Sequence, residues 1–304
     1  MSATATSGSS TPVTPQATPS DTANCTLDTC PLDSSFYMYR INLVPNVAFL
    51  AFFSCSLLAF ICVYALTRRW FSFLVAMALG TVCEIIGYMG RILSHHNQWE
   101  ENYFLIQIIC LTIGPAFFSA GIYLCLSHIV GLFGPEHSRI PATWYPKMFI
   151  PCDIVALILQ ATGGAIAAIA LGDGTSLDTG DNIMIAGLSF QVLTLLIFIV
   201  ICVDFGFRVW KGQKVGKEAH SEPTTKPPTV SWQVKGFLAA VALSTFTIFW
   251  RCTYRVAELS RGWTGPITRR QDLFVWFEGF LISIAVAALE VFHPSLCLRE
   301  NRTD

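Results

Sequence analysis

Residues 41–67 read INLVPNVAFLAFFSCSLLAFICVYALT and contain no Asp, Glu, Lys or Arg. A helix needs about 20 predominantly apolar residues to cross a bilayer, so this stretch is long enough to span one. Three more stretches are equally free of these charged residues, at 102–135, 154–172 and 182–203. The chain therefore contains at least four segments that are typical of membrane-spanning helices.

Three further apolar stretches contain a few charged side chains. They are residues 70–90 with Glu84, residues 234–250 with Lys235, and residues 272–293 with Glu278 and Glu290. All seven stretches are apolar on every side, whereas the strands of a membrane barrel are about 10 residues long and alternate polar with apolar positions. The sequence predicts an all-α, polytopic membrane protein, a bundle of seven transmembrane helices.

The composition agrees with a membrane protein and excludes several other classes. Only 13% of the 304 residues are charged and 53% are hydrophobic, against about 25% charged in soluble domains. A net charge of −1 shows no basic excess, so no nucleic-acid partner is expected. No Cys and His spacing resembles a zinc site and no phosphate-binding loop is present, so we predict no metal and no cofactor.

The distribution of Lys and Arg predicts the orientation, because cytoplasmic loops are enriched in both. With the N-terminus outside and the C-terminus cytoplasmic, twelve of the 19 basic residues fall on the inner side. The seven outer ones are Arg40, Arg91, Arg251, Arg255, Arg261, Arg269 and Arg270. Five of these crowd into residues 251–270, which we read as an outer loop that departs from the rule.

This orientation divides the chain into three parts. Residues 1–40 form a disordered, Ser/Thr/Pro-rich extracellular tail, residues 41–294 form the seven-helix domain with a basic cytoplasmic loop at about 207–234, and residues 295–304 form a cytoplasmic tail. Asn24 begins a glycosylation sequon, and Cys25 and Cys30 could close a disulfide outside the cell. We expect a plasma-membrane protein, with an endomembrane location as the alternative.

Ionisable and amide side chains inside the predicted spans are candidates for function, because they are expensive to bury in a bilayer. Glu84, Tyr88 and Arg91 follow an i, i+4, i+7 pattern on one helical face, and Arg251, Arg255 and Glu258 repeat it. Other candidates are Asp153, Gln160, Gln191 and Glu278. Polar pairs that only hold helices together are the alternative interpretation for each of them.

The same residues carry a resemblance. Glu84-Ile85-Ile86-Gly87-Tyr88 with Arg91, then Gly114-Pro115, then Asp153 with Gln160, then Gln191, then the run from Arg251 to Glu258, and finally His293-Pro294 resemble the fungal lipid-translocating exporter family. The resemblance covers residues 37–294 and implies seven helices, an outside N-terminus and an association with resistance to sphingoid long-chain bases. Gln271, Val275 and Glu278 depart from the Glu, Tyr and Asp usual in that family.

We therefore predict a transporter, exporter or translocase of amphipathic lipids such as sphingoid bases. In this hypothesis a substrate path is lined by Glu84, Tyr88, Asp153, Gln160, Gln191 and Glu278. An outer gate or clamp would consist of Arg91, Arg251, Arg255 and Glu258. Gly114-Pro115 and Gly163-Gly164 would supply helix breaks, with close approach of a neighbouring helix as the alternative for the two adjacent glycines.

Two other classes compete with the transporter. A seven-helix receptor or regulator of lipid homeostasis fits the topology, and the sequence contains no nucleotide site or obvious inverted repeat that would favour transport. An intramembrane metal-dependent hydrolase would need His and acidic ligands, but only His128 and His293 lie in or beside the spans. We predict that the protein is not an enzyme.

Overall fold

The computed structural model describes residues 25, 29–32, 35–134, 138–173, 175–219, 232–261 and 268–298. The regular structure of this part of the chain is helical, and seven of its helical runs are long and apolar enough to cross a membrane. This confirms the predicted all-α fold with seven spans. Most of the predicted N-terminal tail, much of the basic loop and the end of the C-terminal tail lie outside the described residues.

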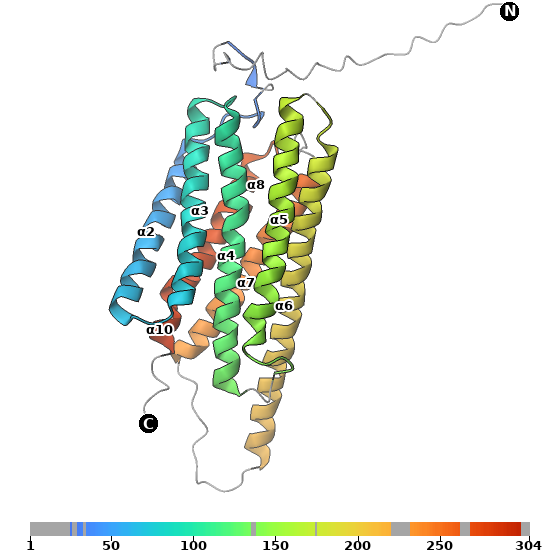
Figure 1. Ribbon diagram of the computed structural model, residues 1–304. Coiled ribbons are helices and arrows are strands. Elements are labelled where there is room, and N and C mark those ends of the chain that lie inside the picture. The colour runs from blue at the N-terminus through green and yellow to red at the C-terminus, as the bar shows by residue number, and fades with distance from the viewer. Residues whose placement is uncertain are drawn as a thin grey trace, which may run out of the picture.

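The spans follow one another along the chain. They are α2 (Leu43–Thr67), α3 (Phe71–His96), α4 (Glu101–Phe133), α5 (Trp144–Gly172), α6 (Asp178–Ala219), α7 (Trp232–Leu259) and a seventh built from α8 (Gln271–Phe274), η3 (Val275–Phe280), α9 (Leu281–Val291) and α10 (Pro294–Cys297). Successive spans run in opposite directions (Figure 1), so the start of α2 and the end of α10 lie at opposite ends of the bundle. We call these the N-terminal end and the C-terminal end.

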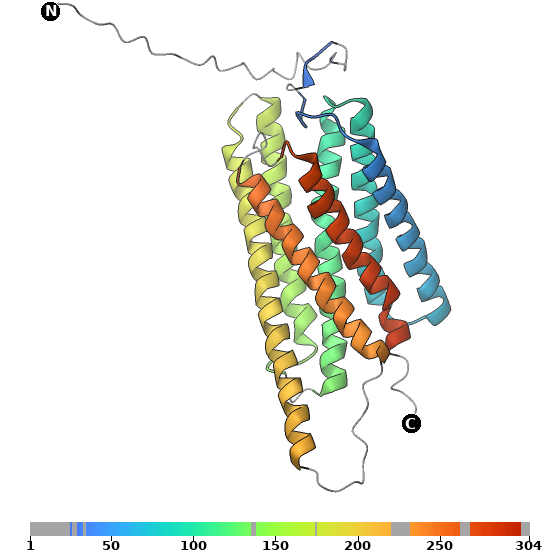
Figure 2. The same cartoon turned by 180° about the vertical axis from the view of Figure 1, so that it is seen from behind.

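Each span packs against the next, and α9 returns to contact α2. The two last spans lie side by side on one face of the bundle (Figure 2), and α7 also contacts α4 across the interior. Of the seven spans, α4 is the most buried and α2 the least. Side chains that point from α3, α5 or α7 toward α4 therefore leave the lipid and enter the protein interior.

Several helices are longer than the charge-free stretches predicted. α5 already begins at Trp144, α6 continues to Ala219, and α7 continues to Leu259. The helix α7 does not end at Trp250 because the arginines that follow turn inward and are paired with carboxylates. Arg251 and Arg255 therefore belong to α7. This confirms their predicted helical spacing with Glu258, and the interpretation of residues 251–270 as one outer loop was wrong for these two.

The predicted helix breaks are also wrong, because α4 runs through Gly114-Pro115 and α5 runs through Gly163-Gly164 without interruption. In α5 the glycine instead allows close helix approach. A Cβ atom added to Gly163 would lie 2.6 Å from the backbone N of Met184 and 2.7 Å from the carbonyl O of Gly180, both in α6. Small residues thus bring α5 and α6 into backbone contact, as is common in membrane bundles.

Candidate functional site

A buried ion pair joins α7 to the seventh span near the centre of the bundle. Arg251 Nη2 lies 2.5 Å from Glu278 Oε1, and the side chains are 0% and 1% exposed. Glu278 lies in η3, a turn of π-helix in which the N–H of Leu281 donates to the carbonyl of Trp276. Single π-turns inside α-helices occur often at functional sites, and this one presents Glu278 to Arg251.

Pro115 explains how Arg251 is also bonded to α4. Proline has no N–H, so it leaves the carbonyl four residues before it without its helical partner. That carbonyl belongs to Leu111, and Arg251 Nη2 donates a hydrogen bond to it. The proline is therefore not a hinge here; it opens a backbone acceptor for the arginine of a neighbouring helix.

A second arginine extends this pair into a cluster. Arg255 Nη1 lies 2.7 Å from Glu258 Oε2, and its Nε lies 3.8 Å from Glu278 Oε2. Its Nη2 donates to the hydroxyl of Thr112 in α4 at 3.3 Å. We call Arg251, Arg255, Glu258 and Glu278 the charge cluster. Its two cations and two carboxylates balance in formal charge.

Glu84 projects from α3 toward this cluster and is only 1% exposed. Among the described residues, neither its Oε2 atom nor the hydroxyl of Tyr88 one turn further along has a hydrogen-bond partner. A Cβ atom at Gly114 would lie 2.7 Å from Glu84 Oε1. Gly114 therefore makes room on α4 for the Glu84 carboxyl.

At the N-terminal end, residues 35–41 cross over α3 and α4; we call this segment the strap. Its Tyr39 hydroxyl accepts a hydrogen bond from Arg91 Nη2 at 2.6 Å, and its Tyr37 hydroxyl contacts Ser94 Oγ at 3.0 Å and Gln107 Oε1 at 2.8 Å. Burial raises the pKa of Tyr37 to about 12 although nearby Arg91 acts in the opposite direction. Tyr37 therefore remains a neutral phenol at physiological pH.

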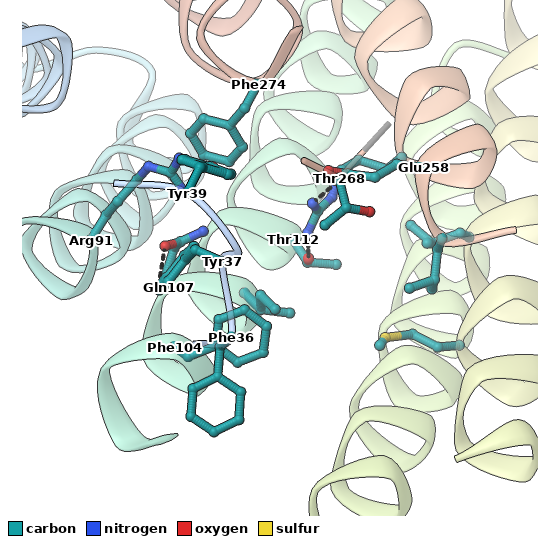
Figure 3. A pocket seen from close by; sticks show the side chains of 15 residues that line it. Phe36, Tyr37, Tyr39, Arg91, Phe104, Gln107, Thr112, Glu258, Thr268 and Phe274 are labelled. Atoms are coloured by element: carbon teal, nitrogen blue, oxygen red, sulfur yellow. Dashed lines mark hydrogen bonds and ion pairs between the residues drawn. The ribbon is translucent and has the colours of Figure 1, made fainter. Parts of the chain in front are cut away.

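Arg91 lies under the strap rather than at the membrane surface. Its guanidinium carbon is 3.7 Å from the centroid of the Phe274 ring and 5.5 Å from that of Tyr37, within the range of cation–π attraction. Figure 3 shows the strap tyrosines and Arg91 on one side of a cavity, with Thr112 and Glu258 on the other. The cavity has a free volume of about 50 Å³, room for a few water molecules.

The remaining predicted path residues form two separate pairs. Asp153 of α5 accepts a hydrogen bond from the Tyr123 hydroxyl of α4 at 3.0 Å, and its Oδ1 atom has no partner. Tyr123 is nine residues beyond Gly114 in α4, about 13 Å further toward the C-terminal end. Gln160 of α5 donates to Gln191 of α6 at 3.0 Å.

The structure brings Glu278 together with two arginines of the predicted clamp, because Arg251 and Arg255 both contact it. The residues that sequence reasoning missed are Thr112, Gln107, Tyr37, Tyr39 and Phe274. Thr112 and Gln107 lie three and eight residues before Pro115. They would have been candidates if the sequence analysis had treated α4 as one continuous helix through Gly114-Pro115.

Residues 77–301 match the family described as RTA1 like protein. The chain belongs to the RTA1-like family. It is 32% identical to the sphingoid long-chain base transporter RSB1 of Saccharomyces cerevisiae strain Lalvin EC1118, over 86% of this chain and 74% of that protein. Protein RTM1 and Protein RTA1 of Saccharomyces cerevisiae are each 26% identical, over 72% of this chain and 66% and 65% of their own lengths. No solved structure matches the chain.

The charge cluster, Glu84 and Asp153 all lie inside the stretch that matches the RTA1-like family. This membership confirms the predicted resemblance to fungal lipid exporters, and none of the three relatives bears the name of an enzyme. Within the described residues, no group of three His, Cys, Asp or Glu side chains is placed to hold a metal ion. His128 packs against Trp70, and His293 packs between the rings of Phe60 and Phe73.

Outside the bundle, Cys25 and Cys30 are joined by a disulfide with a Cα–Cα distance of 5.4 Å. The predicted glycosylation site Asn24 lies outside the described residues. At the C-terminal end, the carboxylate of Asp204 in α6 lies 2.9 Å from Arg139 Nε and 2.9 Å from Arg208 Nε. These three side chains are partly exposed and do not belong to the charge cluster.

Proposed function

We propose that the protein is a membrane transporter that moves amphipathic lipids with a cationic headgroup, such as sphingoid long-chain bases, across or out of the bilayer. The similarity to a sphingoid long-chain base transporter over 86% of the chain supports the substrate class. The observation that carries the site is Glu84, a carboxyl buried in the centre of a span whose Oε2 atom has no hydrogen-bond partner. A primary ammonium is a chemical complement to such a group.

Within this function the predicted residues take two roles. Glu84, Tyr88 and Asp153 provide the polar path for the headgroup, since Glu84 and Asp153 each retain an unpartnered oxygen. Arg251, Arg255, Glu258 and Glu278, with Arg91 above them, form the clamp that closes the path at the N-terminal end. Gln160 and Gln191 bond each other where α5 meets α6, so we assign them to helix packing.

The 50 Å³ cavity above the clamp is too small for a lipid headgroup with its chain, so this conformation is a closed one. Transport requires the clamp or the strap to move. The strap is joined to the bundle by the hydroxyls of Tyr37 and Tyr39, by the contact between the Ile41 carbonyl and His95 and by the stacking of Phe36 on Phe104. These contacts can break without unfolding a helix.

We also propose that the N-terminus lies outside, the C-terminus in the cytoplasm, and that the protein resides in the plasma membrane. The positions of three outer arginines support this orientation, because charges that point into the protein do not count as loop charges. Arg91 and Arg251 are buried, and Arg255 is 14% exposed and paired with Glu258. The exposed outer ones are Arg40, Arg261, Arg269 and Arg270. Glycosylation at Asn24 that is lost in Asn24→Gln, with none at Asn301, would establish the topology; the reverse pattern would invert it.

Flux measurements with purified protein in liposomes test the function. Wild-type protein should move labelled sphingoid base across the bilayer, and Glu84→Gln or Asp153→Asn should lower the rate by about tenfold or more, since each removes a buried charge partner. Protein-free liposomes measure spontaneous movement of the base. Folded, correctly oriented wild-type protein that moves no lipid would indicate the alternative, a seven-helix receptor or regulator.

A further inference from the structure

Among the described carboxyls that lie near the charge cluster, Glu84 is the one that the arginines of the cluster do not neutralise. Arg251 is paired with Glu278 at 2.5 Å, and Arg255 is paired with Glu258 at 2.7 Å. Each arginine of the cluster is thus paired with a carboxylate, and neither is left to neutralise Glu84. If Glu84 were ionised beside them, the buried group would carry a formal charge of −1.

Among the described residues, no other cation acts directly on Glu84. Arg91, the buried cation two turns further along the same face of α3, lies under the strap and is held there by Tyr39 and the ring of Phe274. The charged and titratable groups that act on it are Glu278 from η3, Arg251 and Arg255 from α7, Cys110 from α4, and Cys83 and Tyr88 from its own helix. From α2 the nearest side chains to this face are the rings of Phe49 and Phe53, which pack on Tyr88. Both arginines in this set are already occupied by carboxylates.

An ionised carboxylate without a counterion is strongly disfavoured inside a protein in a bilayer, so Glu84 needs a neutralising partner. Two partners fit, a proton or the ammonium of a lipid headgroup. Gly114 lets the Glu84 carboxyl pack directly on the backbone of α4, so a proton fits in the closed conformation, and the ammonium enters when the helices move apart. The two exclude each other, because each neutralises the same single charge.

We propose that Glu84 binds a proton and a cationic headgroup in turn, so that the protein exchanges one proton for each cationic lipid it moves. The proposal rests on the transport function above. When the headgroup arrives, the O–H bond of the Glu84 carboxyl breaks and an ammonium–carboxylate ion pair forms. When the headgroup leaves, the O–H bond forms again. The lipid is chemically unchanged and the site is neutral in both states.

The proton that restores the O–H bond enters from the N-terminal end, and the proton that the headgroup displaces leaves toward the C-terminal end, the side from which the lipid comes. The proton and the lipid therefore move in opposite directions. Thr112 of α4 accepts a hydrogen bond from Arg255 of the charge cluster, and the cavity with room for a few water molecules adjoins Thr112 and Glu258. The polar atoms and the space for water at this position give the entering proton successive acceptors. Exchange of one proton for one monovalent cation moves no net charge, so a membrane potential should not drive it and a pH gradient should.

Proton release on binding tests the exchange directly. The full chain in nanodiscs is titrated calorimetrically with an N,N,N-trimethyl sphingoid base, in two buffers of different ionisation enthalpy. This probe carries a fixed charge and cannot itself lose a proton. Wild-type protein should release up to about one proton per bound lipid, and its dissociation constant should fall by up to about tenfold per pH unit as the pH rises.

Two variants assign the proton. Glu84→Gln keeps the size of the side chain and should release no proton. Glu290→Gln is the matched control, because it removes another carboxyl of the membrane domain, twelve residues beyond Glu278 and about 18 Å further along the span. It should release as many protons as the wild type. Proton release that persists in Glu84→Gln would overturn the assignment.

The pH dependence of wild-type binding decides the question even if Glu84→Gln does not fold. An affinity for the permanently charged lipid that is constant from pH 5 to pH 8 would overturn the exchange. In liposomes with a trapped pH indicator, lipid flux without proton movement would overturn the exchange and leave the transport function intact. Absence of both binding and flux would overturn the two together.

Discussion

The two sides of the bundle bury polar side chains in different ways. Where α3, α4, α7 and η3 meet, the buried groups are charged and the helices are joined through long side chains, as Arg251 joins Glu278 and the Leu111 carbonyl. Where α5 meets α6, the buried groups are the neutral amides of Gln160 and Gln191, and glycines bring the backbones together.

This difference separates packing from function. Close backbone contact on the α5–α6 side fixes two helices at a distance that small residues determine, and the amide pair adds one hydrogen bond. On the charged side the contacts depend on ion pairs that can exchange partners, and an extra carboxyl, Glu84, lies beside them. The charged side therefore has the capacity to bind a cation and to rearrange, and the amide side supports it.

The largest expected effect is that of breaking the central ion pair. Arg251→Met leaves Glu278 with only the longer contact to Arg255 and leaves the Leu111 carbonyl without a partner, so we expect a loss of about 3–5 kcal/mol in the free energy of unfolding. Unfolding of the purified protein in lipid nanodiscs measures it.

The double variant Arg251→Met with Glu278→Met is the control for this experiment. It removes both charges, so most of the lost stability should return while transport stays absent. A double variant as unstable as the single one would show that the ion pair is not what Arg251 contributes.

Two adjacent glycines test the other side of the comparison. Gly163→Ala would push a methyl group to within 2.6 Å of a backbone nitrogen of α6, whereas at Gly164 the nearest atom is the terminal methyl of Met184 at 4.0 Å. We expect Gly163→Ala to cost about 1–3 kcal/mol of stability through overpacking and Gly164→Ala to be nearly neutral. Thermal unfolding midpoints of the two variants give the result, and equal effects would contradict backbone contact at Gly163.

Much of this architecture was predictable from the sequence. Long apolar stretches without charge indicate spans, and i, i+4, i+7 spacing placed Glu84, Tyr88 and Arg91 on one face. The end of α7 was not predictable from charge alone, because Arg251 is buried only through its ion pair with Glu278, which lies 27 residues further along the chain. The π-turn that presents Glu278 has no sequence signal in Val275–Phe280, and the consequence of Pro115 depends on which helix faces Leu111.

The strap gives a smaller effect that belongs to the charged side alone. Tyr37→Phe removes the hydroxyl that contacts Gln107 and Ser94 but keeps the ring, so we expect a loss of about 1 kcal/mol. Because the strap covers the cavity, Ser94→Cys should react faster with a membrane-impermeant thiol reagent when combined with Tyr37→Phe. An unchanged labelling rate would show that this hydroxyl does not hold the strap closed.

The smallest expected change in stability is that of the hydrogen bond between Gln160 and Gln191. It also tests most directly whether the amide side of the bundle differs in function from the charged side. A double-mutant cycle with Gln160→Leu and Gln191→Leu should give a coupling energy of about 0.6 kcal/mol, the average for hydrogen bonds between membrane helices. Gln160 lies on the same helix as Asp153, about two turns further along, so the same variants also show whether the path extends to it. Lipid flux close to that of the wild type would assign the amides to packing, because a packing pair can lose its hydrogen bond without changing the charge that the substrate meets. A fall in flux as large as that of Glu84→Gln would instead place both amides on the substrate path and remove the distinction between the two sides of the bundle.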